Sequence, residues 1–254
     1  MGDDIKKKYH ELGIDLDSKD INLRVDLHAD EGSFDYDSYV EAQTDINVLK
    51  LDAIGDGPRF KGPPLRRMQA IGGYIKAHIP DVKFGICHGT RTGKEQRDIS
   101  DYLNSSKPSP SKFPEKWVKV IGTEISYTAA GFANTIQWDF HDVKKSWVQN
   151  VCFIFSNSLD HSYDPIKALQ AWMSCIKPNG KIFIQRSESD RPQKKNKEQA
   201  TPEADIFQAS EGMFLKIVDI AGKGLWSVKY PNRLIFNADR GKKYIKKIAV
   251  LERK

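Results

Sequence analysis

The sequence predicts an α/β fold built on a doubly wound, mostly parallel β-sheet. From residue 82 onward, short apolar runs alternate with segments of helical periodicity, which is typical of parallel strands joined by crossover helices. Hydrophobic residues make up 39% of the 254 positions, so the chain can bury a core. The C-terminal part carries several apolar runs, from which we expect an antiparallel strand at that edge of the sheet.

Charge is distributed unevenly along the chain. Residues 1–56 hold 15 acidic and 6 basic side chains, whereas the rest of the chain holds 19 and 34. We therefore predict an acidic N-terminal appendage, helical or irregular, at residues 1–64 and a basic domain at residues 65–254. A basic domain is compatible with nucleic acid, with an anionic cofactor or substrate, or with a solvated surface.

Several classes of protein are excluded by composition and pattern. No apolar window is long enough to span a membrane, and the N-terminus has no apolar signal region. The three cysteines lie in apolar runs, where reduced thiols are expected, and no zinc-binding motif is present. We expect a cytoplasmic protein.

The N-terminal part of the sequence predicts two helices, at residues 36–54 and 65–78, because apolar side chains recur there at helical spacing. Glycines and prolines at residues 55–58 and 61–64 predict turns between them. We expect the first helix to dock on the domain that follows.

The domain itself is predicted from alternating strands and helices. Strands are expected at residues 82–87, 117–121, 134–138, 150–155 and 181–185. Helices are expected at residues 92–103 and 165–176, with a short helical or irregular piece from residue 127. Asp164 and Pro165 have the residue types of an N-cap and a first helical position, and the turn at residues 178–180 should end that helix. Shorter patterns predict a helix at residues 204–216, strands at residues 216–220, 226–230, 233–236 and 244–252, and loops at residues 104–114 and 186–203.

Polar residues follow each of the first four predicted strands of the domain. In a doubly wound sheet, ligands bind at the carboxyl ends of the strands, near the point where the strand order reverses. The residues that follow the strands are CHGTRTG at 87–93, GTE at 122–124, WDFHD at 138–142 and SNSLDHSYD at 156–164. Gly89 and Gly93 let the backbone approach a ligand closely, and Glu124 can accept both hydroxyls of a ribose.

Residues 82–252 resemble the class I S-adenosylmethionine-dependent methyltransferases. The resemblance is strongest over residues 151–184, VCFIFSNSLDHSYDPIKALQAWMSCIKPNGKIFI, which look like the family's fourth strand, an acidic turn with histidine, a helix and a further strand. Lys-Pro-Asn-Gly at residues 177–180 stands where the family has Lys-Pro-Gly-Gly. The resemblance implies a Rossmann-like fold, S-adenosylmethionine (SAM) as cofactor and S-adenosylhomocysteine (SAH) as product.

The glycine-rich loop departs from the family pattern of acid-x-Gly-x-Gly-x-Gly. Cys87 stands at the acidic position, Gly89 and Gly93 match the first and third glycines, and Arg91 replaces the second. The resemblance implies that Arg91 meets the methionine carboxylate of the cofactor; the alternative is that it only caps the loop.

The resemblance also assigns the rest of the cofactor site. It implies that Glu124 binds the ribose, that Asp139 takes the adenine amino group, and that Phe140 or Trp138 lies beside the adenine ring. Further cofactor contacts are expected from His88, Ser156 and Asn157.

Methyl transfer to a hydroxyl requires an aligned acceptor and the removal of a proton. Asp160 and His161 are the predicted general base, with His88 and His141 as second choices. The competing interpretations are that His161 packs over the cofactor and that Asp160 bonds its own loop.

A metal ion is not favoured by the sequence. Asp139, Asp142, Asp160 and Asp164 offer the oxygen ligands that Mg²⁺ takes. Scattered carboxylates are common on a loop-rich face, so we predict no metal ligand and keep Mg²⁺ as the alternative.

The acceptor is predicted from a second resemblance. The runs CHGTRTGKEQ, IGTEIS, QWDFHD and SNSLDHSYDP resemble a subgroup of methyltransferases associated with glycan-assembly enzymes of bacteria and large viruses. This implies O-methylation of a sugar hydroxyl in glycan biosynthesis, by a homodimer or by a domain of a larger protein. Substrate contacts are expected from His141, Tyr163 and Trp226, with Trp138 as a further platform for stacking.

Three other functions stay open, in this order. They are O- or N-methylation of a small metabolite, methylation of RNA or DNA, and a non-catalytic subunit with the SAM-binding fold. Nucleic acid is disfavoured because residues 156–159 lack the Asp/Asn-Pro-Pro-aromatic signature and no basic strand interleaved with aromatic residues is present.

Overall fold

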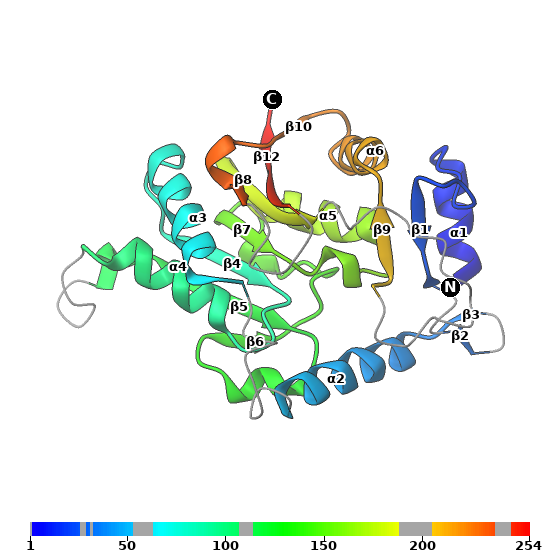
Figure 1. Ribbon diagram of the computed structural model, residues 1–254, viewed down its shortest axis with the longest axis horizontal. Helices are drawn as coiled ribbons and strands as arrows, with labels where there is room; N and C mark the ends of the chain where they lie inside the picture. The colour runs from blue at the N-terminus through cyan, green and yellow to red at the C-terminus, as the bar shows by residue number, and fades with distance from the viewer. Residues whose placement is uncertain are drawn as a thin grey trace.

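The protein folds around one central sheet with helices on both faces (Figure 1). The computed structural model describes residues 2–25, 29–30, 33–52, 63–106, 114–187, 205–236 and 245–254. The strands of the sheet are β4 (Phe84–His88), β5 (Lys119–Glu124), β6 (Thr135–Gln137), β7 (Val151–Ser156), β8 (Ile176–Ser187), β10 (Trp226–Lys229), β11 (Ile235–Phe236) and β12 (Lys246–Arg253).

The strand order confirms the doubly wound sheet. The order is β10-β12-β8-β7-β4-β5-β6, and β11 also pairs with β12. The pairs β4–β5, β5–β6, β4–β7 and β7–β8 are parallel, whereas β12 is antiparallel to β8, as the sequence predicted for the C-terminal edge. Since the chain proceeds from β4 toward β6 and then returns to β7, the strand order reverses at β4 and β7, which is where such folds bind ligands.

Two hydrophobic cores cover the two faces of the sheet. The helices are α1 (Gly2–Glu11), α2 (Tyr36–Asp52), α3 (Leu65–His78), α4 (Lys94–Asn104), α5 (Pro165–Cys175) and α6 (Glu211–Ala221). Along β7, Phe153 and Phe155 pack in the core under α3 and α4, whereas Ile154 packs in the core under α5 and α6. This alternation is what a strand buried on both faces requires.

Helix α5 begins as predicted. The side chain of Asp164 accepts a hydrogen bond from the backbone N–H of Lys167 at 3.0 Å, and Pro165 is the first helical residue. The cap satisfies one of the backbone donors that an α-helix leaves free at its start. The cap also fixes the loop that precedes it, residues 157–163, at the carboxyl end of β7.

The predicted strand at residues 233–236 is shorter in the structure, because Asn232–Leu234 form a 3-10 helix and only Ile235–Phe236 are strand. Two further segments of the prediction are wrong. The turn expected at residues 178–180 lies inside β8, which starts at Ile176 directly after α5; Asn179 takes a left-handed backbone conformation there, with φ of 65°. Asparagine tolerates this conformation well, so an irregular strand continues where a turn was expected.

The second error concerns residues 204–220. Phe207–Ala209 form strand β9, the helix α6 starts only at Glu211, and residues 216–220, predicted as a strand, lie within it. Ser210 caps α6 by accepting from Met213 N at 3.3 Å, and Phe214, Ile217 and Val218 are buried at helical spacing. The helical period of these apolar residues outweighs their β propensity.

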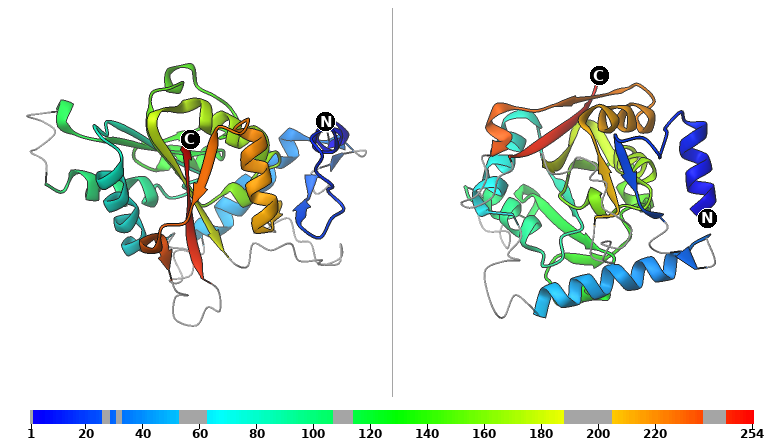
Figure 2. Two further views of the ribbon diagram at one scale, coloured as in Figure 1. Left: turned by 90° about the horizontal axis from the view of Figure 1, so that it is seen from above. Right: turned by 45° about the vertical axis from the view of Figure 1, so that its right-hand side comes forward.

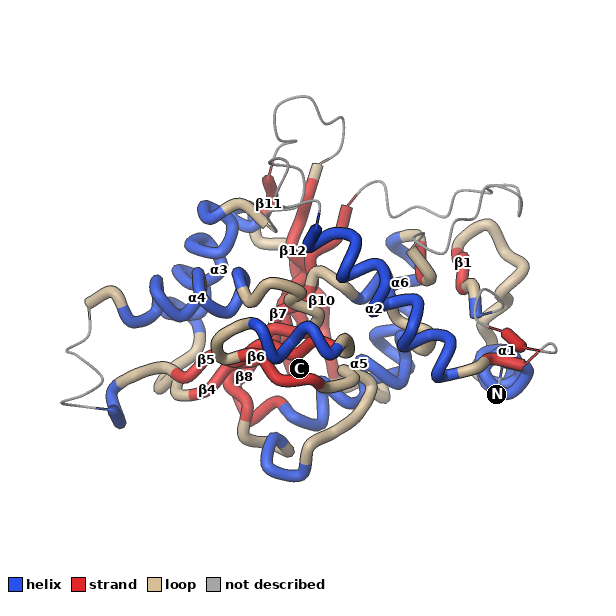
Figure 3. The backbone as a smooth tube through the Cα atoms, turned by 90° about the horizontal axis from the view of Figure 1, so that it is seen from below, coloured by secondary structure: helices blue, strands red, loops and turns tan. Residues whose placement is uncertain are grey.

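The N-terminal region packs onto the domain. Strand β1 (Ile21–Leu23) pairs antiparallel with β9, and β2 (Ala29–Asp30) pairs with β3 (Ser33–Phe34). Figure 2 shows α1 beside β1, with β9 on the other side of β1, and Figure 3 shows α2 lying across the molecule as seen from below. Tyr9 and Tyr39 are buried in the same core as α5, so this acidic segment shares the core of the domain.

Short 3-10 helices complete the described chain: η3 (Pro114–Lys116), η4 (Tyr127–Gly131), η5 (Lys145–Trp147), η6 (Leu159–His161) and η9 (Asn232–Leu234). Several predicted loops lie outside the described residues, namely residues 55–58, 61–62, 107–113 and 188–203, and so does the start of the last predicted strand, residue 244. Within the described part of the chain, no helix has the length and apolar character needed to cross a bilayer.

Candidate functional site

A cavity lies at the carboxyl ends of β4, β5, β6 and β7; the space between its walls, including the part open to solvent, is about 450 Å³. Residues that follow these strands line it, together with one face of α2: Gly89, Arg91, Glu124, Ile125, Asp139, Phe140, Ser158 and His161 from the strand ends, and Tyr39, Gln43, Ile46 and Asn47 from the helix. The sequence placed the site at these strand ends; it did not predict that α2 forms a wall of it.

The loop after β4 brings its backbone close to the cavity. Gly89 and Gly93 take left-handed conformations, with φ of 70° and 68°, and Arg91 takes one with φ of 34°. A Cβ atom on Gly89 would lie 2.5 Å from Cβ of Ser158, so only glycine fits that position. Gly89 and Arg91 line the cavity, whereas Gly93 caps α4 behind it.

Glu124 is almost fully buried and ties the loop to α2. It accepts hydrogen bonds from Asn47 Nδ2 at 2.7 Å and from the backbone N–H of Arg91 at 3.0 Å. Arg91 Nε in turn donates to Asn47 Oδ1 at 2.9 Å. Burial raises the pKa of Glu124, and its hydrogen bonds with the backbone of Ser126 and Arg91 oppose that rise.

Burial lowers the pKa of the Arg91 guanidinium, and the carboxylates of Glu124 and Glu95 oppose this effect. Desolvation acts against both charged forms because a buried charge loses its hydration. Arg91 and Glu124 thus place two poorly hydrated groups of opposite charge beside one cavity, where a polar ligand can replace the missing water.

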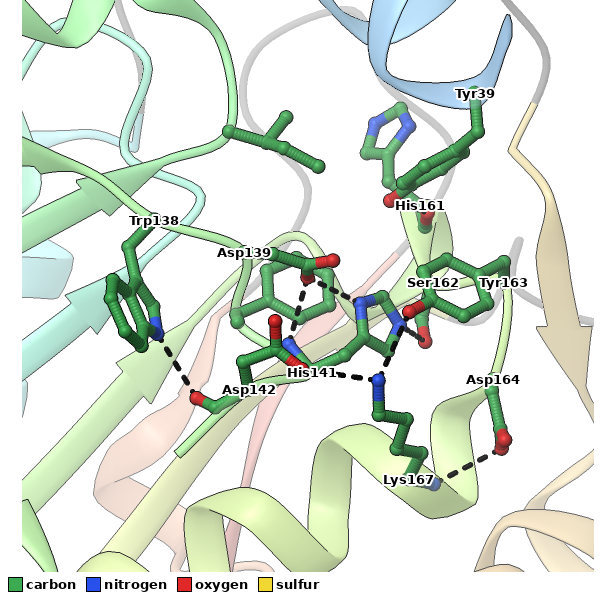
Figure 4. A network of polar contacts seen from close by, with 12 residues as sticks. Tyr39, Trp138, Asp139, His141, Asp142, His161, Ser162, Tyr163, Asp164 and Lys167 are labelled. Atoms are coloured by element: carbon green, nitrogen blue, oxygen red, sulfur yellow. Dashed lines mark hydrogen bonds and ion pairs between the residues drawn. The ribbon is translucent and has the colours of Figure 1, made fainter. Parts of the chain in front are cut away.

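Asp139 forms the centre of a second network, which Figure 4 shows. Its carboxylate accepts from Nδ1 of His141 at 2.6 Å and from the hydroxyl of Tyr36 at 2.9 Å. His141 Nε2 lies 2.7 Å from Oγ of Ser162, and its ring stacks on Tyr163 at 3.9 Å. Burial acts to raise the pKa of Asp139, but the hydrogen bonds with His141 and Tyr36 outweigh it, so the pKa lies below its usual value.

The predicted substrate residue His141 is buried behind Asp139 and does not line the cavity, and three other predicted residues do not line it either. His88 is buried, with Nδ1 2.8 Å from Oγ1 of Thr123 and its ring stacked on Trp172; burial lowers its pKa to about 3. Tyr163 is buried against Tyr39 and His141, and Trp226 is buried on β10 beside Gly222. Ring stacking and core packing account for all three positions.

Ser156 and Asn157 are also set back from the cavity. Ser156 Oγ donates to the backbone carbonyl of His88 at 3.2 Å, and Asn157 Nδ2 donates to Glu95 Oε1 at 3.4 Å. Their neighbour Ser158 lines the cavity and donates to the carbonyl of Gly89 at 3.0 Å. The residue of this turn that lines the cavity is therefore Ser158, one or two positions after the residues that the sequence predicted.

Asp160 and His161, the predicted base, lie on η6 between two cavities. His161 lines the cavity described above, and Asp160 lines a second, smaller one with residues of β8 and β9. Burial lowers the pKa of His161 to about 4, against the opposing effect of Asp205. The imidazole is therefore neutral at pH 7, the form that carries a free lone pair.

The sequence reasoning missed four residues near the site. Gln43 and Asn47 are buried polar residues of α2, Asp205 lies beside Asp160, and Glu95 is buried at the start of α4. Burial raises the pKa of Glu95 to about 7. The one available signal was in α2, where Gln43 falls on an otherwise apolar helical face.

Comparison with known proteins identifies the fold. No family model and no curated protein matches the sequence. A SAM-dependent methyltransferase from Leishmania major has a TM-score of 0.56 and 13% identity, over 98% of this chain and 91% of that chain. The CcbJ methyltransferase from Streptomyces caelestis has a TM-score of 0.52 and 12% identity, over 82% of this chain and 98% of that chain.

A third solved structure is the 1,6-didemethyltoxoflavin-N1-methyltransferase from Burkholderia thailandensis, with bound 1,6-didemethyltoxoflavin and SAH. It has a TM-score of 0.51 and 12% identity, over 87% of this chain and 92% of that chain. The chain therefore has the fold of class I SAM-dependent methyltransferases, as its sequence predicted. The glycan-associated subgroup stays a prediction.

Proposed function

We propose that the protein is a SAM-dependent methyltransferase and that SAM binds in the cavity at the carboxyl ends of β4 to β7. The observation that carries this proposal is the gathering of Gly89, Arg91, Glu124, Asp139 and Phe140 around one cavity at the reversal of the strand order. The fold supports it, because open α/β sheets bind their ligands at this point.

The lining residues fit the cofactor by their chemistry. Glu124 Oε2, which accepts from the backbone of Arg91, has a further lone pair for a ribose hydroxyl. The Arg91 guanidinium can meet a carboxylate, and Phe140 offers an apolar face to adenine. Bound SAM supplies a methyl group that is already activated by its sulfonium.

The wall formed by α2 adds a further polar contact. Gln43 is buried, lines the cavity, and its Nε2 atom has no hydrogen-bond partner in the described structure. A buried donor without an acceptor is destabilising, so it favours a ligand with an acceptor atom. We propose that Gln43 donates to bound cofactor.

We propose a methyl acceptor from one of three classes. A sugar hydroxyl is the first class to test, followed by small metabolites and then RNA or DNA. The base role of Asp160 and His161 stays a prediction; His161 lines the proposed cofactor cavity and Asp160 lines the neighbouring one, where we propose that the acceptor binds.

The test is a transfer assay with SAM and four acceptor panels: nucleotide sugars, oligosaccharides, small hydroxyl or amine metabolites, and RNA. Mass spectrometry would measure both SAH and the methylated product. We expect both to rise together in one panel. A protein that binds SAM but transfers methyl groups in no panel would contradict the enzyme and favour a non-catalytic subunit.

A further inference from the structure

We propose that Asp160, His161 and Asp205 bind a divalent metal ion beside η6, where His161 lines the first cavity and Asp160 lines the second. One ligand atom from each of these three side chains lies within 4.8 Å of the other two. No other group of this kind occurs among the described residues. Binding of the ion does not depend on the proposed function, whereas its role toward an acceptor does.

The separation of the three side chains suits an ion. Ligands on opposite sides of a divalent ion lie roughly 4 to 5 Å apart, because each bond is about 2.0–2.6 Å long. Small side-chain rotations would therefore bring the three atoms into a coordination sphere. Three protein ligands leave positions open for water or for an acceptor oxygen.

The backbone holds the ligands in place. The backbone N–H of His161 donates to the carbonyl of Ser158 at 3.1 Å, and the hydroxyl of Tyr39 donates to the carbonyl of His161 at 3.0 Å. Asp205 comes two residues before β9, which pairs with β1. The site is thus anchored on two sides by secondary structure.

A second, independent observation points to a ligand at His161. Its Nδ1 atom is shielded from solvent and has no hydrogen-bond partner in the described structure. Buried imidazole nitrogens normally form a hydrogen bond or bind a metal, so a nitrogen with neither indicates a binding position for a ligand. The neutral state of the ring is also the state that binds metals.

Charge favours a divalent cation. Two carboxylates beside a neutral imidazole carry two negative charges, which one divalent ion neutralises. Lys50 and Arg91 lie near enough to lower the pKa of His161, and their charge weakens the attraction without cancelling the two carboxylates. A mixed set of one nitrogen and two oxygens suits Mn²⁺, Fe²⁺ or Zn²⁺ better than Mg²⁺.

The carboxylates considered from the sequence do not form this site together. Asp139 is bonded to His141, Asp142 is paired with Lys167, and Asp164 caps α5. Only Asp160 of that set belongs to the present cluster.

The experiment is a titration of the full-length, chelator-treated protein with Mn²⁺, followed by electron paramagnetic resonance. We expect one site of micromolar affinity with nitrogen hyperfine coupling from His161. This measurement uses the wild-type protein and needs no variant to fold. Asp205→Asn and His161→Gln should each weaken binding by about tenfold or more, and His161→Gln should abolish the nitrogen coupling.

The matched control is Asp142→Asn, which changes an exposed carboxylate paired with Lys167 and should leave Mn²⁺ binding unchanged. Affinity weaker than millimolar, or a site that Asp205→Asn leaves unaltered, would overturn the proposal. SAH binding is measured on the same preparations. In the wild-type protein, absence of Mn²⁺ binding with SAH binding intact refutes the metal site alone, and absence of SAH binding with Mn²⁺ binding intact refutes the cofactor site alone.

Discussion

Arg91 combines a backbone that suits glycine with a side chain that bonds across the site. Its φ of 34° lies in the left-handed region, which costs an L-residue roughly 1 kcal/mol. Its side chain reaches Asn47 on α2. Strain retained beside a cavity is typical of functional positions. The hydrogen bond with Asn47 offsets part of the cost of arginine at a position where the resembled family has glycine.

We predict that Arg91→Gly weakens SAH binding without a large change in the free energy of unfolding. The relieved backbone and the lost hydrogen bond each contribute about 1 kcal/mol with opposite sign, so unfolding free energy should change little. SAH affinity should fall about tenfold or more, because a charged contact to the cofactor carboxylate is lost. Calorimetry and urea unfolding measure the two effects, with Arg91→Lys as the control that keeps the charge; equal SAH affinity in Arg91→Gly and wild type would refute the contact.

Glu95 should make stability depend on pH. Burial raises its pKa from 4.5 to about 7, so between these values the folded protein keeps a proton that the unfolded chain has released. The free energy of unfolding therefore falls as pH rises through this window, by roughly 3 kcal/mol in total.

Glu95→Gln should remove that part of the pH dependence. We expect the variant to unfold at higher urea than wild type at about pH 8 and to differ little below about pH 4.5. Glu115→Gln is the control, because Glu115 is exposed. Parallel pH profiles for Glu95→Gln and wild type would contradict the raised pKa.

At the scale of elements, helix α2 determines the shape of the site. Tyr36 bonds Asp139, Tyr39 bonds the backbone of His161, and Asn47 bonds Glu124. One helix thus contacts the last residue of β5 and residues that follow β6 and β7. Its position is fixed by contacts far apart in the sequence.

We predict that Asn47→Ala weakens SAH binding by about tenfold. Glu124 and Arg91 would each lose a hydrogen bond with Asn47, at 2.7 and 2.9 Å, and these bonds connect α2 to the strand ends. Asp45→Ala is the matched control on the exposed face of the same helix. Unchanged affinity in Asn47→Ala would show that α2 is not part of the binding site.

The elements that the sequence predicted well have strong local signals. Helix α3 matches its prediction at both ends, and α5 begins at the predicted Asp-Pro cap. Strand β8 and helix α6 were predicted poorly because Asn179 in a strand and Phe207 before a cap have no unambiguous local pattern. There, pairing with β7 and β1 decides the structure.

At the scale of the whole molecule, the N-terminal region shares the domain's main core. Ile14 is almost fully buried in that core. Ile14→Ala should lower the free energy of unfolding by about 2–5 kcal/mol, and calorimetry should show one cooperative transition at a lower temperature. Leu12→Ala, at an exposed position, should have little effect; a separate early transition in Ile14→Ala, with the main one unmoved, would instead indicate an independent appendage.

Local sequence patterns predicted some residues of the site, whereas contacts between distant segments determine the others. Glu124, Asp139 and Phe140 were predictable because parallel strands end at one edge of a sheet. The sequence could not show that His88 turns into the aromatic core, nor that Asn47 and Asp205 arrive from distant segments. Those placements depend on packing between elements.

The central claim is that this cavity binds SAM, and isothermal titration calorimetry of the wild-type protein with SAM and SAH tests it most directly. We predict saturable binding at one site, with micromolar affinity for both ligands. An absence of binding heat for both ligands at millimolar concentration, at two temperatures, would contradict it.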